Sequence, residues 1–413
     1  MTRVSGRMAK AGLLVLVLAG GCGSDASKKV PGGEATTIKI GTLHPLTGTS
    51  AANGNNRDQA VDLAVTEINA AGGVLGRHLE VLHRDQGTAA DKAVMAAMSL
   101  VQEGVVAIVG PSSSASSLAV LNGVTRPLNM PQLSCCSTSP ALGGMDNFFR
   151  TVPSDVLQSK VLARKAQQAG FSKVAIIYVE GAYGQGLAEG FMASFGASGA
   201  SIMYKEEQPS YAAVVDAAIV GSPDAILLIA YPSDGGKILQ ESLAKRVQVR
   251  WMFSDSLHSQ SFIDNLSAAK PLVEGAIGTA PAPSNDAADQ ARRATFAAAY
   301  KAAFSIDPTS FTDTAYDATY LLAAAIQKAG VTTPAEVTAQ IRGVSGGAPG
   351  AIQVGPNEWA KALSTLKMGG QVDYQGASGP VDLDENGEPP TGYYIEWTVT
   401  SARLVDSRDA ERP

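Results

Sequence analysis

Short apolar runs alternate with amphipathic segments along most of the chain, and this alternation restricts the fold more than any other feature. Between residues 173 and 254 the runs are rich in Val, Ile and Leu, and each precedes a segment with apolar residues at helical spacing. Such runs are typical of strands buried on both faces of a sheet. A repeated strand–helix order predicts a parallel sheet with helices on both faces. The predicted strands are Lys173–Val179, Ala200–Tyr204, Ala225–Ala230 and Val249–Ser254.

The same order of elements precedes residue 150, which indicates a second unit of the same kind. A chain of 413 residues exceeds what one hydrophobic core organises. We therefore expect an α/β protein with two doubly wound parallel-sheet lobes that meet near residues 150–153. The predicted strands of the first lobe are Thr37–Leu43, His78–His83, Val105–Val109 and Pro131–Ser134, with helices over residues 59–71 and 89–101.

The last third of the chain first predicts helices and then changes its pattern. Helices are expected over residues 287–305, 312–329 and 334–343. Residues 371–384 and 392–405 then alternate between apolar and polar side chains on either side of Asp384–Gly387. This arrangement predicts a hairpin-like turn at Asp384–Gly387.

Three serines follow the predicted strand Val105–Val109. Gly110-Pro111 ends that strand, and Ser112–Ser114 lead into a segment with helical spacing. Ligands of α/β proteins usually bind at the carboxyl edge of the sheet, and the free N–H groups of a helix's first turn attract an anion there. The serines are equally typical of a simple helix N-cap. Position alone leaves both interpretations open.

The first 21 residues are typical of an export signal. A basic segment with Arg3, Arg7 and Lys10 precedes the apolar run Ala11–Ala19, which is too short to cross a membrane. Leu18–Cys22 resembles the lipobox of bacterial lipoproteins, in which the Cys is acylated, although Ala19 takes the usual place of Leu. An ordinary signal peptide cleaved nearby is the alternative.

We therefore expect a signal peptide over residues 1–21, an acylated Cys22, and a polar flexible tether over residues 22–36. These expectations predict an extracytoplasmic protein, in the periplasm or at the cell surface, that a lipid holds to the membrane. No later stretch of the sequence is long and apolar enough to span a bilayer.

Charge and cysteine content exclude several classes of partner. The net charge is −6 and no long basic run occurs, so nucleic acid is not expected as a partner. Cys135 and Cys136 are adjacent, and they suit either two small buried thiols or a vicinal disulfide. Two cysteines without a second pair make no zinc site, and the four histidines show no ligand spacing. We expect neither a metal nor a cofactor.

Several short motifs are spread along the chain: Ile38–Leu46 with Gly48, Gly54, Glu67–Gly73 and Gly76, then Val109–Pro111 with Ser114, Ser137–Pro140, Tyr183–Gly186 and Tyr316–Ala318. Together they resemble the branched-chain amino-acid binding proteins of ABC transporters, which are type I periplasmic binding proteins. The resemblance implies two lobes joined by three crossovers, with the ligand enclosed between them. It assigns residues 37–152 and about 280–355 to an N-terminal lobe, residues 153–279 and about 356–405 to a C-terminal lobe, and residues 406–413 to a tail.

The resemblance also implies ligand-binding residues in both lobes. One lobe would hold the carboxylate of an amino acid through the Ser114 hydroxyl and backbone N–H groups. Ser137 and Thr138 would add contacts to the polar head of the ligand. The other lobe would supply aromatic contacts, which match Tyr183 and Tyr231.

An acidic residue for the ligand's ammonium group is implied as well, and Asp255 matches it. The chemistry agrees, because a zwitterion needs an anion site and a carboxylate that are both screened from water. Other roles stay open: Asp255 also suits a helix cap, the two tyrosines suit packing at the hinge, and the Ser137-Thr138 pair suits a turn.

Asn53 marks a departure from the family pattern. Many members carry an aromatic residue just before the glycine that matches Gly54, where it forms a wall of the side-chain pocket. A polar wall at Asn53 suits a polar side chain, an amide or a urea as well as an aliphatic ligand. Arg57 is near enough in sequence to share the pocket, but an arginine is expected at the surface.

These observations predict a binding protein and not an enzyme. The sequence has no Gly-x-Ser-x-Gly elbow and no Walker loop, and its serines have no His–Asp partners at a recognisable spacing. The expected function is that of a solute-binding lipoprotein of an ABC importer, which closes around an amino acid or a small amide-like solute and delivers it to a membrane permease. The alternative is a sensor whose closure signals to a receptor.

Overall fold

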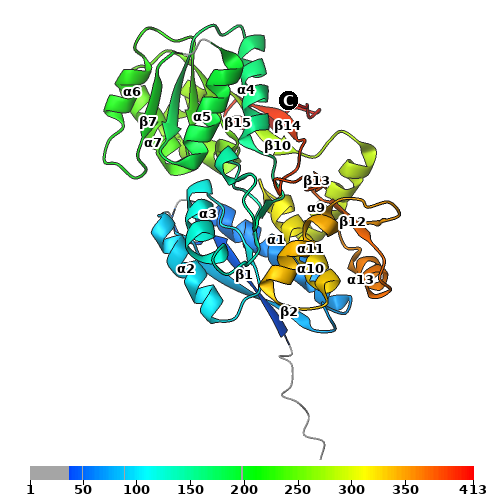
Figure 1. Ribbon diagram of the computed structural model, residues 1–413. Coiled ribbons are helices and arrows are strands. Elements are labelled where there is room, and N and C mark those ends of the chain that lie inside the picture. Colours follow the sequence, from blue (N-terminus) through cyan, green and yellow to red (C-terminus); the bar gives the residue numbers. More distant parts are fainter. Residues whose placement is uncertain (1–36, 49, 88, 197–198) are drawn as a thin grey trace, which may run out of the picture. The chain divides into compact units, whose positions relative to one another are not determined.

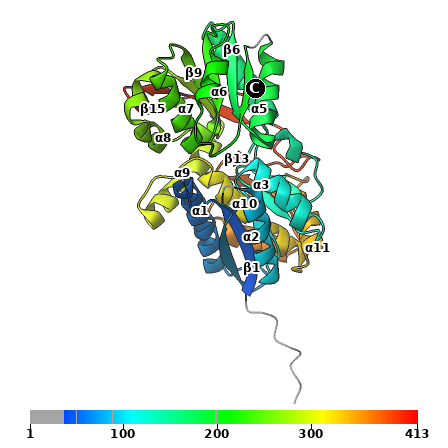
Figure 2. The ribbon, with the colours of Figure 1, turned by 90° about the vertical axis from the view of Figure 1, so that its left-hand side faces the viewer.

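The computed structural model describes residues 37–413 except residues 49, 88, 197 and 198, and Thr37–Pro413 form one compact unit. The expected signal peptide, the acylated Cys22 and the tether lie outside the described residues. Within the unit, two large sheets each carry their own helices and hydrophobic core (Figures 1 and 2). The expected α/β fold with two doubly wound lobes is confirmed.

The first sheet has five parallel strands in the order β2-β1-β3-β4-β5. Its strands are β1 (Thr37–His44), β2 (His78–Asp85), β3 (Ile108–Val109), β4 (Gln132–Ser134) and β5 (Phe148–Arg150). The connecting helices are α1 (Ala51–Ala70), α2 (Ala90–Gln102) and α3 (Ser114–Val120), which continues as a π-helical turn over Leu121–Thr125. β3 is shorter than the five residues expected, although the N–H of Val106 still bonds to Lys39 of β1.

The second sheet has seven strands in the order β15-β14-β10-β9-β8-β6-β7. Strands β6 to β10 are parallel, whereas β14 pairs antiparallel with β10 and with β15. The strands are β6 (Val174–Val179), β7 (Ser201–Tyr204), β8 (Ala225–Ile229), β9 (Arg250–Phe253), β10 (Ile277–Ala282), β14 (Tyr393–Thr400) and β15 (Arg403–Asp406). The helices are α4 (Asp155–Gln168), α5 (Ala182–Phe195), α6 (Ala212–Ala218), α7 (Pro232–Ala244) and α8 (Gln260–Asn265), with 3-10 turns over Asp255–Leu257 and Ser267–Val273.

The chain passes between the lobes after β5, after β10 and after β13, which gives the three crossovers expected for this fold. Between the second and third crossovers it returns to the first lobe. That part contains α9 (Ala287–Phe304), α10 (Thr312–Ala329), α11 (Pro334–Gln340), α12 (Arg342–Ser345) and α13 (Trp359–Lys367), and the strands β11 (Ile352–Val354), β12 (Val372–Gly376) and β13 (Gly379–Pro380).

Two boundaries differ from the sequence-based expectation. Residues 356–381 were expected in the C-terminal lobe, but Trp359, Leu363 and Tyr374 are buried in the core of the first lobe. The indole N–H of Trp359 donates to the carbonyl of Gly73 at 3.0 Å, which attaches α13 to the end of α1. The tail expected over residues 406–413 also differs, because β15 includes Asp406 and Glu411 pairs with Tyr394.

The hairpin predicted around Asp384–Gly387 is wrong. A turn does form there, with the N–H of Gly387 donating to the carbonyl of Asp384 at 3.1 Å. Its flanking segments belong to different sheets, however, because β12 pairs with β11 and β13 while β14 pairs with β10 and β15. The turn therefore leads into the third crossover.

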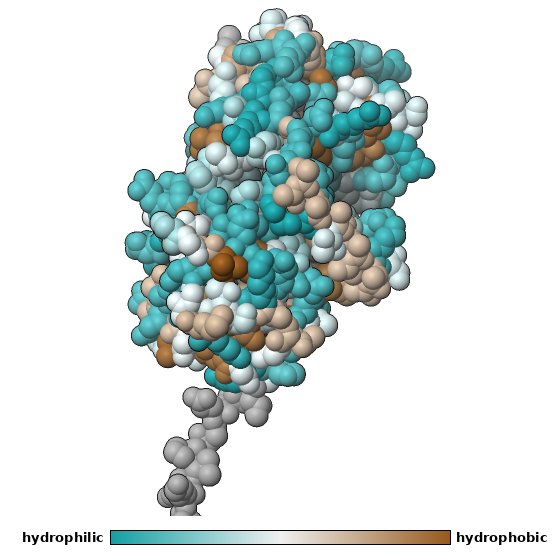
Figure 3. All heavy atoms as spheres, turned by 90° about the vertical axis from the view of Figure 1, so that its right-hand side faces the viewer, coloured by the Kyte–Doolittle hydropathy of each residue, from teal (hydrophilic) through white to brown (hydrophobic). Residues whose placement is uncertain are grey.

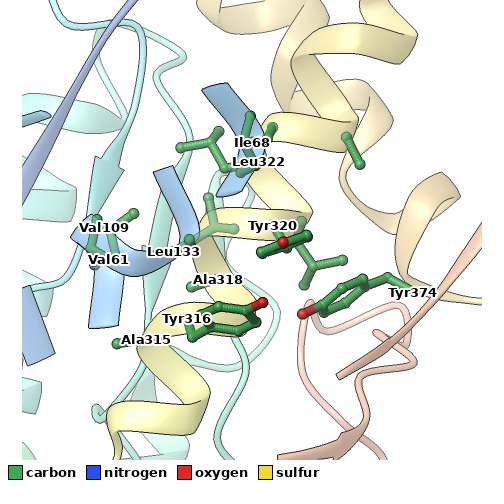
Figure 4. Packing of buried hydrophobic residues seen from close by; sticks show 14 of the residues in the cluster. Val61, Ile68, Val109, Leu133, Ala315, Tyr316, Ala318, Tyr320, Leu322 and Tyr374 are labelled. Atoms are coloured by element: carbon green, nitrogen blue, oxygen red, sulfur yellow. The ribbon is translucent and has the colours of Figure 1, made fainter. Parts of the chain in front are cut away.

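Helix α10 organises the core of the first lobe (Figure 4). Tyr316, Tyr320 and Tyr374 lie together there, with Tyr320 and Tyr374 stacked at 5.6 Å between ring centroids. Asp317 is fully buried beside them and accepts four hydrogen bonds, two from backbone N–H groups and two from hydroxyls, at 2.6 to 2.8 Å. These bonds attach the segment around β12 and β13 to α10.

Two glycines allow helices to approach the strands that precede them. A Cβ atom on Gly54 of α1 would lie 1.9 Å from the carbonyl oxygen of Pro45, and a Cβ atom on Gly184 of α5 would lie 2.0 Å from that of Val179. Any larger residue would push the helix away. Both helices begin beside the carboxyl ends of their sheets, so the two glycines position residues of the candidate site.

Candidate ligand-binding site

A cavity of about 380 Å³ lies at the carboxyl ends of the parallel strands, with walls from both lobes. The hydroxyl of Ser139 donates to the carbonyl of Ala182 at 2.8 Å, and His258 lies 3.0 Å from the Ser310 hydroxyl, so the lobes also touch beside it. This is the position where α/β proteins usually bind ligands. The cavity lining includes five of the residues singled out from the sequence: Asn53, Ser114, Tyr183, Tyr231 and Asp255.

Ser114 is the first residue of α3, directly after β3. The N-cap is its neighbour Ser113, whose hydroxyl accepts a hydrogen bond from the N–H of Ser116 at 3.4 Å. The Ser114 hydroxyl accepts from the N–H of Ser139 at 3.2 Å, and the hydroxyl of Ser112 is buried without a partner among the described residues. The start of α3 therefore presents hydroxyls and N–H groups to one side of the cavity.

Tyr183 and Asp255 meet on the other side, from α5 and from the turn after β9. The Tyr183 hydroxyl donates to a carboxylate oxygen of Asp255 at 2.8 Å and lies 2.9 Å from the hydroxyl of Ser256. The ring of Tyr231 stacks on that of Tyr183, with 5.7 Å between centroids. Asp255 is the first residue of the 3-10 turn Asp255–Leu257, and the N-cap position before it belongs to Ser254, whose side chain makes no capping hydrogen bond.

Asp155, which sequence reasoning did not single out, lies buried behind this acid at the start of α4. Burial raises the pKa of Asp255. Burial, and then repulsion by Asp255, raises the pKa of Asp155 well above its ordinary range. One oxygen of Asp155 accepts from the Thr138 hydroxyl at 2.9 Å, and the other has no partner among the described residues.

Ser137 and Thr138 do not line the cavity. The Ser137 hydroxyl lies 2.8 Å from that of Ser117 and donates to the carbonyl of Pro111 at 3.1 Å. The Thr138 hydroxyl is used by Asp155. Both side chains therefore support the loop behind the cavity, in agreement with the structural alternative stated for them.

Helix α1 begins eight residues earlier than predicted and brings Asn53 into the wall of the cavity. Asn53 and Arg57 lie on one face of this helix and line the cavity, as does the N-cap residue Ser50. The expectation that Arg57 is exposed is wrong: only 8% of the residue is accessible. Its guanidinium lies over the ring of Phe311, with 5.3 Å from Cζ to the centroid.

Sequence reasoning also missed an acidic group in the second lobe. Glu206 and Asp234 line the cavity, and burial together with the charge of Asp234 raises the pKa of Glu206 to about 7. Both residues follow predicted strands of the second sheet, so their position at the carboxyl edge was the available signal.

Cys135 and Cys136 form a vicinal disulfide, and Cys136 lines the cavity. The sulfur of Cys135 lies 3.7 Å from Nε2 of the buried His44. Among residues 37–413, apart from the four left out, no group of His, Cys, Asp and Glu side chains is arranged to hold a metal ion.

Figure 3 shows a face on which polar residues predominate and apolar residues lie in small groups. No described helix combines the length and apolar character needed to cross a bilayer.

Comparison with known proteins gives consistent matches over the unit that the structure describes. The periplasmic binding protein family matches residues 37–395. The chain is 30% identical over 382 residues to the chemotactic signal transduction system substrate-binding protein BasB of Halobacterium salinarum, which covers 87% of this chain and 86% of that protein. It is 29% identical over 311 residues to the Leu/Ile/Val-binding protein BraC3 of Rhizobium johnstonii, covering 73% and 82%.

A solved structure shows the same fold. The branched-chain amino acid transporter substrate-binding protein LivJ of Streptococcus pneumoniae, in complex with isoleucine, superposes with a TM-score of 0.74. It is 22% identical in sequence, and the match covers 91% of this chain and all of that one. At this identity the likeness supports the fold and not the ligand.

Proposed function

Because the chain belongs to the type I periplasmic binding proteins of the branched-chain amino-acid family, we propose that it binds an amino acid or an amino-acid-like solute between its lobes. One observation carries the proposal: the start of α3 with Ser114 and the Tyr183–Asp255 pair line the same cavity from opposite lobes. Hydroxyls and N–H groups at a helix start favour a carboxylate. A buried carboxylate opposite favours an ammonium group.

Closure follows from this division of contacts. In an open state the ligand contacts only one lobe and makes only part of its polar contacts. In the closed state it contacts both lobes, so ligand binding stabilises the closed state. The cavity volume of about 380 Å³ suits a small solute. Tyr183 and Tyr231, stacked on one another, cover the ligand and orient the acid.

Calorimetry of site variants tests this proposal. A thermal-shift panel of amino acids, amides and ureas first identifies a ligand, since a true ligand raises stability by mass action. We expect Ser114→Ala and Asp255→Asn each to weaken its binding about 10- to 100-fold, the value of a lost hydrogen bond to a charged group. Ser116→Ala is the matched control, because its buried hydroxyl has no partner among the described residues and does not line the cavity.

Wild-type affinity in both site variants would refute these roles. Recovery of the ligand unchanged after long incubation is expected of a binding protein, whereas its conversion would indicate an enzyme.

The proposed cellular role is delivery of the solute to the permease of an ABC importer. The family is extracytoplasmic, and relatives such as BraC3 are named as Leu/Ile/Val-binding proteins. We also propose that Cys22 is acylated and that residues 22–36 tether the binding unit to the membrane. A permease and an ATPase encoded beside the gene would support transport.

Sensing is the second candidate function. The similarity to BasB, named as a component of a chemotactic signal transduction system, favours it specifically. Both functions use the same closure around a ligand, and they differ in whether the closed protein contacts a permease or a receptor.

A further inference from the structure

Arg57 is a buried cation with no hydrogen-bond or salt-bridge partner in the part of the chain that the structure describes. It is only 8% accessible, its side chain lines the cavity, and its Nε–H is fully buried. Within the described residues its Nε–H has no hydrogen-bond partner, and the charges of Asp255 and Asp58 act on the guanidinium without forming a salt bridge to it. The adjacent acid, Asp58, is turned away and bonds to His44 at 2.8 Å, with His83 at 3.1 Å from the same oxygen.

An unpaired guanidinium at this depth is costly, because both its charge and its five N–H donors are removed from water. Burial lowers the pKa of Arg57 only to about 10, so the group stays charged at neutral pH. Contact with the Phe311 ring covers one face of the guanidinium and leaves its edge as the route for hydrogen bonds. The N–H donors of Arg57 therefore need a hydrogen-bond acceptor, and a ligand in the cavity can supply it.

The charges around the cavity show which end of the ligand would meet Arg57. Among the described lining residues, Arg57 is the only charged side chain of the first lobe. The second lobe contributes the acids Glu180, Glu206, Glu207, Asp234 and Asp255, with Lys237 beside them. Anionic groups of a ligand are thus attracted to the first lobe and cationic groups to the second.

Two separate places in the first lobe suit an anion. One is the start of α3, which the proposed function assigns to the α-carboxylate of an amino acid. The other is the face of α1, where Asn53 precedes Arg57 by one helical turn and adds an amide. A planar guanidinium with a neighbouring amide is well suited to a carboxylate.

We infer that the preferred ligand is an α-amino acid with a second carboxylate on its side chain, and that Arg57 binds this second carboxylate. The inference rests on the proposed function. An aliphatic side chain at this place would leave the guanidinium buried and unpaired. The branched-chain amino acids of the relatives' names are therefore expected to be poor ligands.

A ligand panel on wild type and Arg57 variants tests the inference. The probes are glutamate, aspartate, glutamine, leucine and glutarate, measured by calorimetry at pH 7.5. We expect wild type to bind glutamate or aspartate about 10- to 100-fold more tightly than glutamine or leucine. Arg57→Gln should remove this preference by weakening the acidic ligands alone, and Arg57→Lys should restore part of it.

Arg84→Gln is the matched control. This arginine is on β2 of the same lobe, pairs with Glu103 and does not line the cavity. Its replacement should leave all affinities unchanged. Thermal unfolding of each variant checks that it folds.

The outcomes separate the inference from the proposed function. Tight, Asp255-dependent binding of leucine with no preference for glutamate would overturn the inference and leave the function standing. Equal weakening of every ligand by Arg57→Gln would also overturn it, because Arg57 would then hold a group common to all amino acids or link the two lobes. Glutarate binding as tightly as glutamate, with the same loss in Arg57→Gln, would support the anion site and overturn the ammonium role of Asp255. If none of the five probes binds to wild type, the inference fails, and the thermal-shift panel of amino acids, amides and ureas decides whether the proposed function stands.

Discussion

The Asp155–Asp255 pair should couple ligand binding to proton release, and Asp155→Asn is the variant that exposes this coupling. Asp155 lies behind the cavity and does not line it, so it acts on the ligand only through Asp255. Asparagine has nearly the same shape as aspartate, and its amide oxygen can accept the hydrogen bond that the Thr138 hydroxyl donates to Asp155 at 2.9 Å. The substitution therefore changes one buried charge and little else.

The sign follows from the raised pKa values of both acids. In the unliganded protein this pair binds more protons in the folded state than in the unfolded state, so its contribution to the free energy of unfolding decreases as pH rises above about 3.8, the ordinary pKa of aspartic acid. An ammonium group favours the ionised pair, so its binding expels a proton. Below the raised pKa, affinity should increase about tenfold per pH unit for each proton released, or about 1.4 kcal/mol.

Asp155→Asn should reverse both effects. Removing a buried carboxylate with an unpaired oxygen should raise the free energy of unfolding at pH 7.5 by about 1–3 kcal/mol. The proton held by the higher-pKa member of the pair, Asp155, is then absent, so fewer protons should be released on binding and the plateau of affinity should be reached at lower pH.

Urea unfolding across pH measures the first effect. Calorimetry in two buffers of different ionisation enthalpy counts the protons. Asp264→Asn, at an exposed position of the same lobe, is the control and should change neither quantity. An Asp155→Asn protein that is less stable than wild type at pH 7.5, with an unchanged proton count, would refute the reasoning.

Two further predictions concern the framework of the site. Asp317→Ala should lower the free energy of unfolding by about 3–5 kcal/mol in urea titrations, because four donors at 2.6 to 2.8 Å lose their acceptor; a loss below about 1 kcal/mol would show that water replaces the carboxylate easily. Gly54→Ala would place a Cβ atom 1.9 Å from the carbonyl oxygen of Pro45, so it should cost about 1–3 kcal/mol. Since it also displaces Asn53 and Arg57, it should weaken ligand binding, and unchanged affinity would contradict the placement of α1.

The lobes were predictable because buried parallel strands have a distinctive composition. Apart from Lys173 at its start, the run Lys173–Val179 is apolar, as is Ala225–Ala230, and the structure has strands in both. The return of the chain between lobes was not predictable from such patterns. Trp359 and Tyr374 would suit the hydrophobic core of either lobe. Their hydrogen-bond partners are in the first lobe: Trp359 donates to Gly73, and Tyr374 donates to Asp317.

The hairpin expected around Asp384–Gly387 failed for the same reason. An alternating pattern specifies that a strand has one buried face, but it does not name the neighbouring strand. The segments on either side of this turn do form strands, but β12 pairs with β11 and β13 while β14 pairs with β10 and β15, so the two do not pair with each other. Local turn chemistry was correct, and the long-range pairing determined the outcome.

The position of Arg57 in the site differs from what its residue type predicts. An arginine in an unknown sequence is best placed at the surface, because isolated buried charges are rare. Arg57 departs from that rule because α1 begins at Ala51, and the helix face that carries Asn53 into the cavity carries the residue one turn later with it. The same polar position that weakened the case for an aliphatic ligand in the sequence therefore has a cationic neighbour in the structure. The cost of burying this cation is offset when a bound ligand pairs with it. The charge of the ligand's side chain is therefore the most informative property to vary.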